Sequence, residues 1–183
     1  MKKYLVIYYS KTGNSKFLAE KISNELGCDL KKIKPVTESL LLLFLMSLLK
    51  INVSTGISRE DIEEYDEVII LGPIWGGLLI SPLRSMLKIC VKAEKPVHFA
   101  VSCETSEELK DSKYGYGQVL REAEQLGGKL VRTTGAFSTS LVQNNNGSWS
   151  PKLSEKTKIT EENFIGIIRS RFNDFINRIQ SKT

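Results

Sequence analysis

The stretch YLVIYYSKTGNS, residues 4–15, decides the fold of this chain. Residues 4–9 form a nearly continuous apolar and aromatic run, which is typical of a parallel strand buried on both faces. A short polar loop follows, and an amphipathic helical pattern then runs from Ser15 to Leu26 and stops at Gly27. Strand, polar loop and helix in this order indicate the first unit of an α/β sheet.

The alternation of strand and helix patterns continues along the 183 residues. Alternating elements predict a parallel sheet with right-handed crossovers and helices on both faces. We expect an α/β fold with a doubly wound five-stranded sheet in the order 2-1-3-4-5, formed by residues 1–183 as one domain. The further strands are expected at residues 28–33, 67–71, 97–102 and 129–137, the helices at 40–49, 81–91, 116–126 and 161–179, and a long polar loop at about 138–160.

The composition is that of a globular protein, with 41% apolar and 26% charged residues and a net charge of +5. A basic surface suits nucleic acid, an anionic membrane or an acidic protein partner. The densest basic group, Lys31, Lys32 and Lys34, has no interleaved aromatic residues of the kind a single-strand binder uses. We therefore expect no nucleic-acid partner.

The cysteines and the apolar runs indicate whether the chain binds a metal, which redox environment it suits and whether it crosses a membrane. Cys28, Cys90 and Cys103 lack CxxC spacing, and the single His98 cannot complete a zinc set, so no metal site is expected. An odd, sparse cysteine count suits a reducing, cytoplasmic environment. The apolar run at residues 40–51 is shorter than the roughly 20 residues that span a bilayer, so we expect no transmembrane segment.

The first loop, residues 10–15, concentrates hydrogen-bond donors between a strand and a helix. Its glycine allows a tight turn, and the helix start presents free N–H groups and a partial positive charge. This pattern predicts a phosphate cradle built mainly from neutral donors, although it is neither GxGxxG nor GxxxxGK(S/T). The alternative is an ordinary helix cap by Asn14 or Ser15. The candidate phosphate ligands are Ser10, Thr12, Gly13, Asn14 and Ser15.

The second loop, GPIWGG at residues 72–77, places a tryptophan between a strand end and two glycines. Trp75 could stack on a flat ring, while Gly76 and Gly77 let backbone groups approach the edge of that ring. The alternative is that Trp75 only caps the end of the sheet. In this fold the loop lies beside the first loop, which favours a ligand role.

The motif S-x-T-G-N-S after an N-terminal strand, followed by YDEVIILGPIWGGLLISPLRSML at residues 65–87, resembles the flavodoxin family. The resemblance covers roughly residues 1–137 and is strongest to members with G-x-P-I/V-W in the second loop. It implies flavin mononucleotide (FMN) as cofactor, with the phosphate in the first loop and the isoalloxazine ring between the second and third loops. By this match the ring is lined by Pro73, Ile74, Trp75, Gly76 and Gly77.

The third loop, residues 102–106, follows the fourth strand and departs from the usual family pattern. Its backbone N–H groups could bind the pyrimidine edge of the ring, so Ser102, Cys103 and Glu104 are candidate cofactor ligands. Tyr114 or Tyr116 could supply a stacking ring, or both could face solvent. A redox role for Cys103 is an alternative that the lack of a partner cysteine disfavours.

Three further segments are interpreted separately. A helix at residues 40–51 would be apolar on every side, which predicts burial in the core or in a homodimer interface, with an apolar-substrate or membrane patch as the alternative. His98 is expected to be a core or edge residue. The stretch at residues 144–149 carries Trp149, which could close over a ligand.

These observations leave three functions open. The first is an FMN-binding electron carrier between partner proteins, and the second is an FMN-dependent reductase that takes hydride from NAD(P)H and reduces a quinone or similar acceptor. The third is a flavin-free module that only binds a partner. Electron shuttles of this family are markedly acidic and this chain is basic, which weakens the first without selecting the second. The pattern identifies no catalytic residue.

Overall fold

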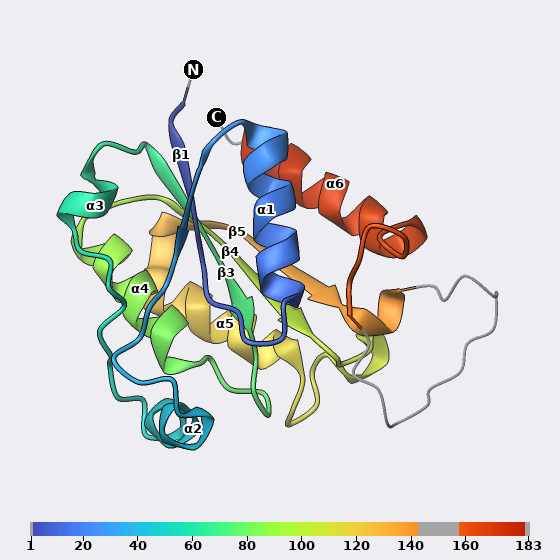
Figure 1. Cartoon of the computed structure of the whole chain (residues 1–183), viewed down its shortest axis with the longest axis horizontal. Coiled ribbons are helices and arrows are strands. Elements are labelled where there is room, and N and C mark those ends of the chain that lie inside the picture. Colours follow the sequence, from blue (N-terminus) through green and yellow to red (C-terminus); the bar gives the residue numbers. More distant parts are fainter. Residues whose placement is uncertain (1, 143–157, 182–183) are drawn as a thin grey trace.

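The computed structural model describes residues 2–142 and 158–181, and its centre is a five-stranded parallel sheet in the order β2-β1-β3-β4-β5 (Figure 1). This order confirms the predicted doubly wound arrangement. Strands are added to one side of β1 with β2 and to the other side with β3, β4 and β5, so the switch point of the sheet lies between β1 and β3. These two strands pair in parallel from Tyr4 with Glu67 to Tyr8 with Leu71. The strands are β1 (Tyr4–Tyr8), β2 (Asp29–Lys32), β3 (Glu67–Pro73), β4 (Val97–Cys103) and β5 (Val131–Ser138).

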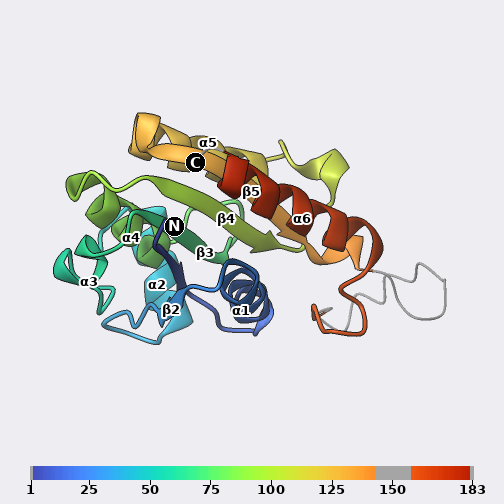
Figure 2. The same cartoon turned by 90° about the horizontal axis from the view of Figure 1, so that it is seen from above.

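Helices cover both faces of the sheet (Figures 1 and 2). On one face lie α1 (Asn14–Leu26) and α6 (Gly166–Ser181), and on the other lie α4 (Ser81–Lys92) and α5 (Tyr116–Gly127). Shorter elements fill the connections: α2 (Leu40–Leu48), α3 (Glu60–Glu63), and the single 3₁₀ turns η1 (Glu107–Leu109), η2 (Gly128–Leu130) and η3 (Thr139–Leu141).

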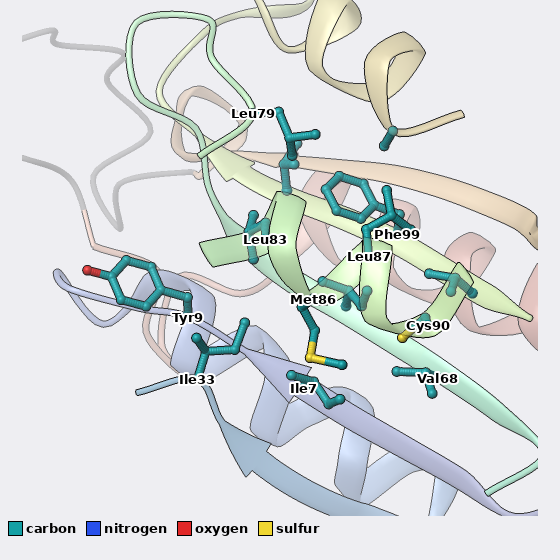
Figure 3. Close-up of a cluster of buried hydrophobic side chains, with 14 of the residues drawn as sticks. Ile7, Tyr9, Ile33, Val68, Leu79, Leu83, Met86, Leu87, Cys90 and Phe99 are labelled. Atoms are coloured by element: carbon teal, nitrogen blue, oxygen red, sulfur yellow. The ribbon is translucent and has the colours of Figure 1, made fainter. Parts of the chain in front are cut away.

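Alternate residues of each central strand feed two separate apolar cores. Leu5 and Ile7 of β1 face α4 and α5, whereas Tyr4, Val6 and Tyr8 face α1 and α6. Figure 3 shows side chains of β1, β3 and β4 meeting those of α4 in the first core. Burial on both faces explains why the central strands are predominantly apolar in sequence.

His98 lies in the core, as expected, with its side chain fully buried. Its Nε2 is 2.7 Å from Oε2 of Glu67, whose Oε1 receives a 2.6 Å hydrogen bond from Lys2 Nζ. Burial, together with the cations Arg132 and Lys2 nearby, lowers the pKa of His98. The histidine is therefore a neutral, structural residue at the end of the sheet opposite the loops described below.

Several element boundaries differ from the predicted ones, most of all at the start of the last helix and of the fifth strand. The last helix starts at Gly166 instead of residue 161, because residues 160–164 form a turn in which Phe164 N donates to Thr160 O at 3.0 Å. Gly166 has a φ of +60°, which is incompatible with an α-helix that runs from residue 161 through this position. The fifth strand starts at Val131, after the turn η2 has taken up the expected first residues. The stretch 144–149, which carries Trp149, lies outside the described residues.

The prediction that α2 is buried in the core is wrong. Only Leu43 and Ser47 of α2 are buried, because the helix projects beyond the carboxyl edge of the sheet and packs mainly on the start of α4 (Figure 1). Ser47 Oγ accepts a 2.8 Å hydrogen bond from Ser81 N and donates a 2.6 Å bond to Leu43 O. Among the residues that the structure describes, no helix combines the length and apolarity needed to cross a membrane.

Candidate ligand site at the carboxyl edge

The first loop turns sharply at Gly13, whose φ is +105° and whose N–H donates to Ser10 Oγ at 3.2 Å. The first intrahelical hydrogen bond of α1 runs from Phe17 N to Gly13 O at 2.9 Å. The N–H groups of residues 14–16 therefore precede the helical ladder and have no acceptor within it. A Cβ built on Gly13 would meet nothing within 4 Å, so open space lies beside these donors.

The alternative of an ordinary cap is wrong for this loop. Gly13, and neither Asn14 nor Ser15, is the N-cap residue, and no side chain caps α1. Asn14 Oδ1 instead accepts a 3.0 Å hydrogen bond from Ile159 N, and the buried Ser15 hydroxyl shares a 2.7 Å hydrogen bond with the hydroxyl of Ser102. These two side chains fix the loop to neighbouring segments.

The polar side chains that remain at the loop surface are those of Thr12, which is exposed, and Ser10, which is partly exposed. Lys11 Nζ lies 3.8 Å from Oε2 of Glu38, a residue of the β2–α2 connection. The loop itself contains no carboxylate. Hydroxyls, helix N–H groups and one partly neutralised lysine form a set of donors that suits a phosphate group.

The second loop is a tight hairpin. Leu78 N donates to Trp75 O at 3.0 Å, and the two glycines between them have φ values of +56° and +75°. Positive φ at both central residues is the geometry of a type I′ turn, which explains the sequence Gly76-Gly77. Ile74 N donates to Ser102 O at 3.2 Å, which holds the base of this hairpin against β4.

Trp75 is half-buried and contacts Tyr9, the first residue after β1. Their ring centroids lie 6.1 Å apart with an interplanar angle of 73°, an edge-to-face contact. Tyr9 is 3% exposed, and its buried hydroxyl has no hydrogen-bond partner among the described residues. Burial, then the charge of Glu38, raise the pKa of Tyr9. The Tyr9 hydroxyl points away from the other side chains labelled in Figure 3.

The third loop begins later than predicted, at Glu104, because Ser102 and Cys103 belong to β4. Both are buried, and burial raises the pKa of the Cys103 thiol to about 11. A neutral, buried thiol is a poor nucleophile, so the structure gives no support to a redox cysteine here. Only backbone groups of residues 102 and 103 remain as candidate donors to a ligand.

Of the two candidate stacking tyrosines, only Tyr114 is exposed, at 62%. Tyr116 is buried, and its hydroxyl donates to Glu107 Oε2 at 2.7 Å. The hydrogen bond from Tyr116, and then those from Arg171 and Lys110, lower the pKa of Glu107 to about 2. Tyr116 and Glu107 thus hold the third loop in place, and a stacking role is left to Tyr114.

Sequence reasoning missed three contacts at this edge. The Ser15–Ser102 pair joins residues 87 positions apart. Tyr9 was not singled out, although its place directly after β1 at the switch point was visible in the sequence. Phe44 of α2 lies beside the second loop, since a Cβ on Gly76 would be 3.9 Å from Phe44 Cε2.

Comparison with solved structures supports the flavodoxin-like fold. Models of protein families give no match, and neither do curated protein sequences. Among solved structures, the chain is similar to a flavoprotein from Lactobacillus acidophilus in complex with FMN, with 20% identity over 74% of this chain and 93% of that chain and a TM-score of 0.56. Oxidised flavodoxin 2 from Bacillus cereus shares 17% identity over 99% of both chains, with a TM-score of 0.54.

A flavodoxin from Fusobacterium nucleatum bound to FMN shares 14% identity over 100% of this chain and 99% of that chain, with a TM-score of 0.51. These identities are too low to carry ligands or roles from one chain to another. The chain has the flavodoxin-like fold, and its ligand must be argued from its own residues.

Proposed function

We propose that this chain binds one FMN at the carboxyl edge of the sheet and carries electrons between partner proteins. One observation carries the proposal: the phosphate-compatible first loop and the Trp75-Gly76-Gly77 hairpin lie at the ends of β1 and β3, the adjacent strands between which the chain reverses direction. In doubly wound sheets, ligands bind at this switch point. The FMN-bound proteins with the same fold support the choice of cofactor.

The residues present fit the phosphate of this cofactor. Open space beside Gly13 adjoins the N–H groups at the start of α1 and the hydroxyls of Ser10 and Thr12. The partial positive charge of the helix N-terminus favours the anion. Asn14 and Ser15 position this donor set through their bonds to Ile159 and Ser102 and contribute backbone donors.

The residues at the second and third loops fit a flat, largely apolar ring. Pro73, Ile74 and Trp75 offer partly exposed apolar surface, and Gly76, where a Cβ would meet only Phe44 Cε2 at 3.9 Å, leaves space over its backbone. Glu104 and exposed Tyr114 lie on the neighbouring loop. When bound, the flavin supplies the redox chemistry, whereas the protein binds it, orients it and excludes water.

A visible absorption spectrum of the purified protein, before and after incubation with FMN and removal of unbound flavin, tests the proposal. We expect a one-to-one complex with bands of protein-bound flavin. Flavin released by heat and separated by chromatography should be FMN; recovery of FAD, or no retention of flavin at all, overturns the proposal.

The alternative is an FMN-dependent NAD(P)H reductase: the net charge of +5 differs from that of the acidic electron shuttles, which weakens the carrier without selecting the reductase. Anaerobic addition of NADH or NADPH to the FMN-loaded protein separates the two. Bleaching of the flavin by nicotinamide alone supports the reductase. Reduction that requires a protein donor supports the carrier.

A further inference from the structure

The helix α2 exposes an apolar surface that nothing in the described part of the chain covers. We name its outward side chains the α2 patch: Leu40, Leu41, Phe44, Leu45, Leu48 and Leu49. Their exposed fractions lie between 38% and 70%. The helix is held to the body by Leu43 and Ser47, so its exposure is a consequence of its position and is not caused by fraying.

The α2 patch is large for a protein surface. A leucine or phenylalanine offers on the order of 150–200 Å² when fully exposed, so the patch and its neighbours Leu42 and Ile51 leave roughly 600–800 Å² of apolar surface in water. The largest apolar patch of an ordinary monomer measures about 300–600 Å², and larger ones mark interaction sites.

The patch also wraps around most of the helix. Residues of an α-helix follow one another at ~100° intervals, which places Leu43 and Ser47 on one side and spreads the exposed apolar residues from Leu40 to Leu42 over an arc of about 200°. A helix packed on a protein surface usually presents an apolar stripe of only ~100°. The occupant of this surface must therefore enclose the helix from several directions.

The charged residues that flank α2 in the sequence are mostly basic: Lys32, Lys34 and Lys50 outnumber Glu38, whose Oε2 lies 3.8 Å from Lys11 Nζ. No charged residue lies between Ser39 and Leu49. Lys32 and Lys34, where β2 leads toward α2, are exposed and form no ion pair within residues 2–142 and 158–181. Lys50 follows the patch directly in the sequence, and its Nζ forms an ion pair with Glu122 Oε1 at 3.3 Å. The whole chain carries a net charge of +5.

We propose that α2 docks on the surface of a phospholipid bilayer that contains anionic lipids, lying in the interface with its apolar arc among the acyl chains. Fluid acyl chains can contact the full arc, and the lysines beside it can contact lipid headgroups. The helix enters one leaflet only. Because Phe44 adjoins Gly76 and α2 projects from the carboxyl edge, docking brings the candidate ligand site to the membrane surface (Figure 1).

A second copy of the chain is a poorer occupant. In a two-fold dimer the same convex helix would face itself, and ridge-into-groove contact would cover one stripe of each helix. The remaining leucines of the arc would stay in water. The two net positive charges would also repel each other, whereas an anionic bilayer attracts them.

Vesicle flotation of the flavin-free full chain tests the proposal. Wild-type protein should float with vesicles of phosphatidylcholine and phosphatidylglycerol, and less with phosphatidylcholine alone. The double variant Leu41→Glu/Leu48→Glu, at two outward positions of the arc, should lower the partition coefficient by at least about tenfold. Lys32→Gln/Lys34→Gln should lower it by roughly fivefold per lysine on anionic vesicles only.

Ile167→Glu is the matched control. Ile167 lies on α6, far from α2, and is 55% exposed, as Leu48 is at 54% (Figure 1). It introduces one negative charge, as each of the two α2 substitutions does, at an equally exposed apolar position and should leave flotation unchanged. Thermal melts of all variants should agree with that of the wild type, because the changed side chains point into solvent.

Three results would overturn the proposal. Wild-type protein could fail to float, or Ile167→Glu could reduce flotation as much as the α2 variants do. Sedimentation could instead reveal a dimer that Leu41→Glu/Leu48→Glu dissociates, without vesicle binding, in which case a second copy covers the patch. Since the assay uses no flavin, none of these results bears on the proposed binding of FMN.

Discussion

Gly77 packs against the backbone of Tyr114 so closely that a Cβ on Gly77 would lie 2.8 Å from Tyr114 Cα. The same Cβ would lie 2.5 Å from the carbonyl oxygen of Lys113. Gly77 also has a φ of +75°, which side chains disfavour. The second loop therefore contacts the connection between β4 and α5, which carries Lys113 and Tyr114, through the backbone at Gly77.

We predict that Gly77→Ala destabilises the protein by about 3 kcal/mol, because it combines a left-handed conformation with a clash against rigid backbone. Urea unfolding measures the change. Gly27→Ala is the control: its φ of +58° and ψ of +44° are left-handed helical, but its Cβ would meet nothing within 4 Å, so only about 1 kcal/mol of conformational cost is expected. Equal losses in the two variants would mean that the contact with Tyr114 is not tight.

The hydroxyl pair of Ser15 and Ser102 gives a second prediction. Both side chains are buried, so Ser15→Ala or Ser102→Ala should leave the other hydroxyl unpaired and cost about 1–3 kcal/mol. The double variant should cost clearly less than the sum of the two, since no unpaired group remains. Additive losses in a double-mutant cycle by urea unfolding would show that the two hydroxyls are not coupled.

The sequence predicted the sheet because its signal is local: a parallel strand buried on both faces is largely apolar, as β1, β3 and β4 are, with Glu67, His98 and Ser102 as buried polar exceptions. That the first and second loops lie side by side followed from the predicted strand order alone. Contacts between distant residues, such as those of Tyr9 with Trp75 and Ser15 with Ser102, depend on register and side-chain direction, which no local pattern contains.

The exposure of α2 shows where a local apolar pattern does not determine burial. An all-round apolar helix predicts burial in the core or in a homodimer interface, and only the first of these is wrong, because burial in the core depends on where the connections place the helix. The hydrogen bond from Ser81 N to Ser47 Oγ holds α2 at the edge, where Leu43 reaches the core and most of its other apolar side chains do not. The start of the last helix was predicted too early, at residue 161. Polar residues such as Thr160 and Asn163 are common both in turns and at helix starts, and here Thr160 N donates to Asn163 Oδ1 in a turn.

The third prediction concerns pH. The folded protein keeps His98 neutral because burial lowers its pKa, whereas an unfolded chain protonates histidine below about pH 6.5. The unfolded state then binds more protons, so stability should fall as the pH drops below about 6.5, by at most ~1.4 kcal/mol per pH unit. His98→Gln, which does not titrate, should remove this loss. Urea midpoints between pH 5 and 8 measure it.

Glu67 contributes a separate loss at lower pH. Burial alone would raise its pKa, but hydrogen bonds from His98 and Lys2 lower the pKa below its ordinary value. Its stabilising contribution is therefore present above the unfolded pKa of about 4.3 and is lost as the pH falls through the folded value. The loss below pH 4 should persist in His98→Gln; a wild type whose stability is flat from pH 8 to 5 would contradict a neutral His98.

The fourth prediction separates hydroxyl and lysine in the first loop, and it rests on the proposed FMN site. Thr12→Val should weaken FMN binding by roughly fivefold to 150-fold, since a phosphate oxygen loses its hydrogen bond. Lys11→Ala should cost less, because Lys11 already lies near Glu38 and its side chain is partly exposed. Fluorescence titration with FMN gives both constants. A larger loss for Lys11→Ala would show that charge, and not the neutral donors, holds the phosphate.

The last prediction concerns Trp75, whose edge-to-face contact with buried Tyr9 fixes the indole at the end of β3. If a phosphate occupies the first loop, the attached ring system can reach the Trp75 hairpin across the switch point. By analogy with stacking of bases on aromatic side chains, contact between indole and flavin is worth on the order of 1–3 kcal/mol. Trp75→Ala should therefore raise the dissociation constant for FMN by roughly fivefold to 150-fold and relieve the quenching of flavin fluorescence. Trp75→Phe keeps an aromatic ring and should lose less. Unchanged affinity and fluorescence in Trp75→Ala, together with a lowered melting temperature, would mean that Trp75 only caps the sheet, because an indole that serves Tyr9 alone affects stability and not the ligand.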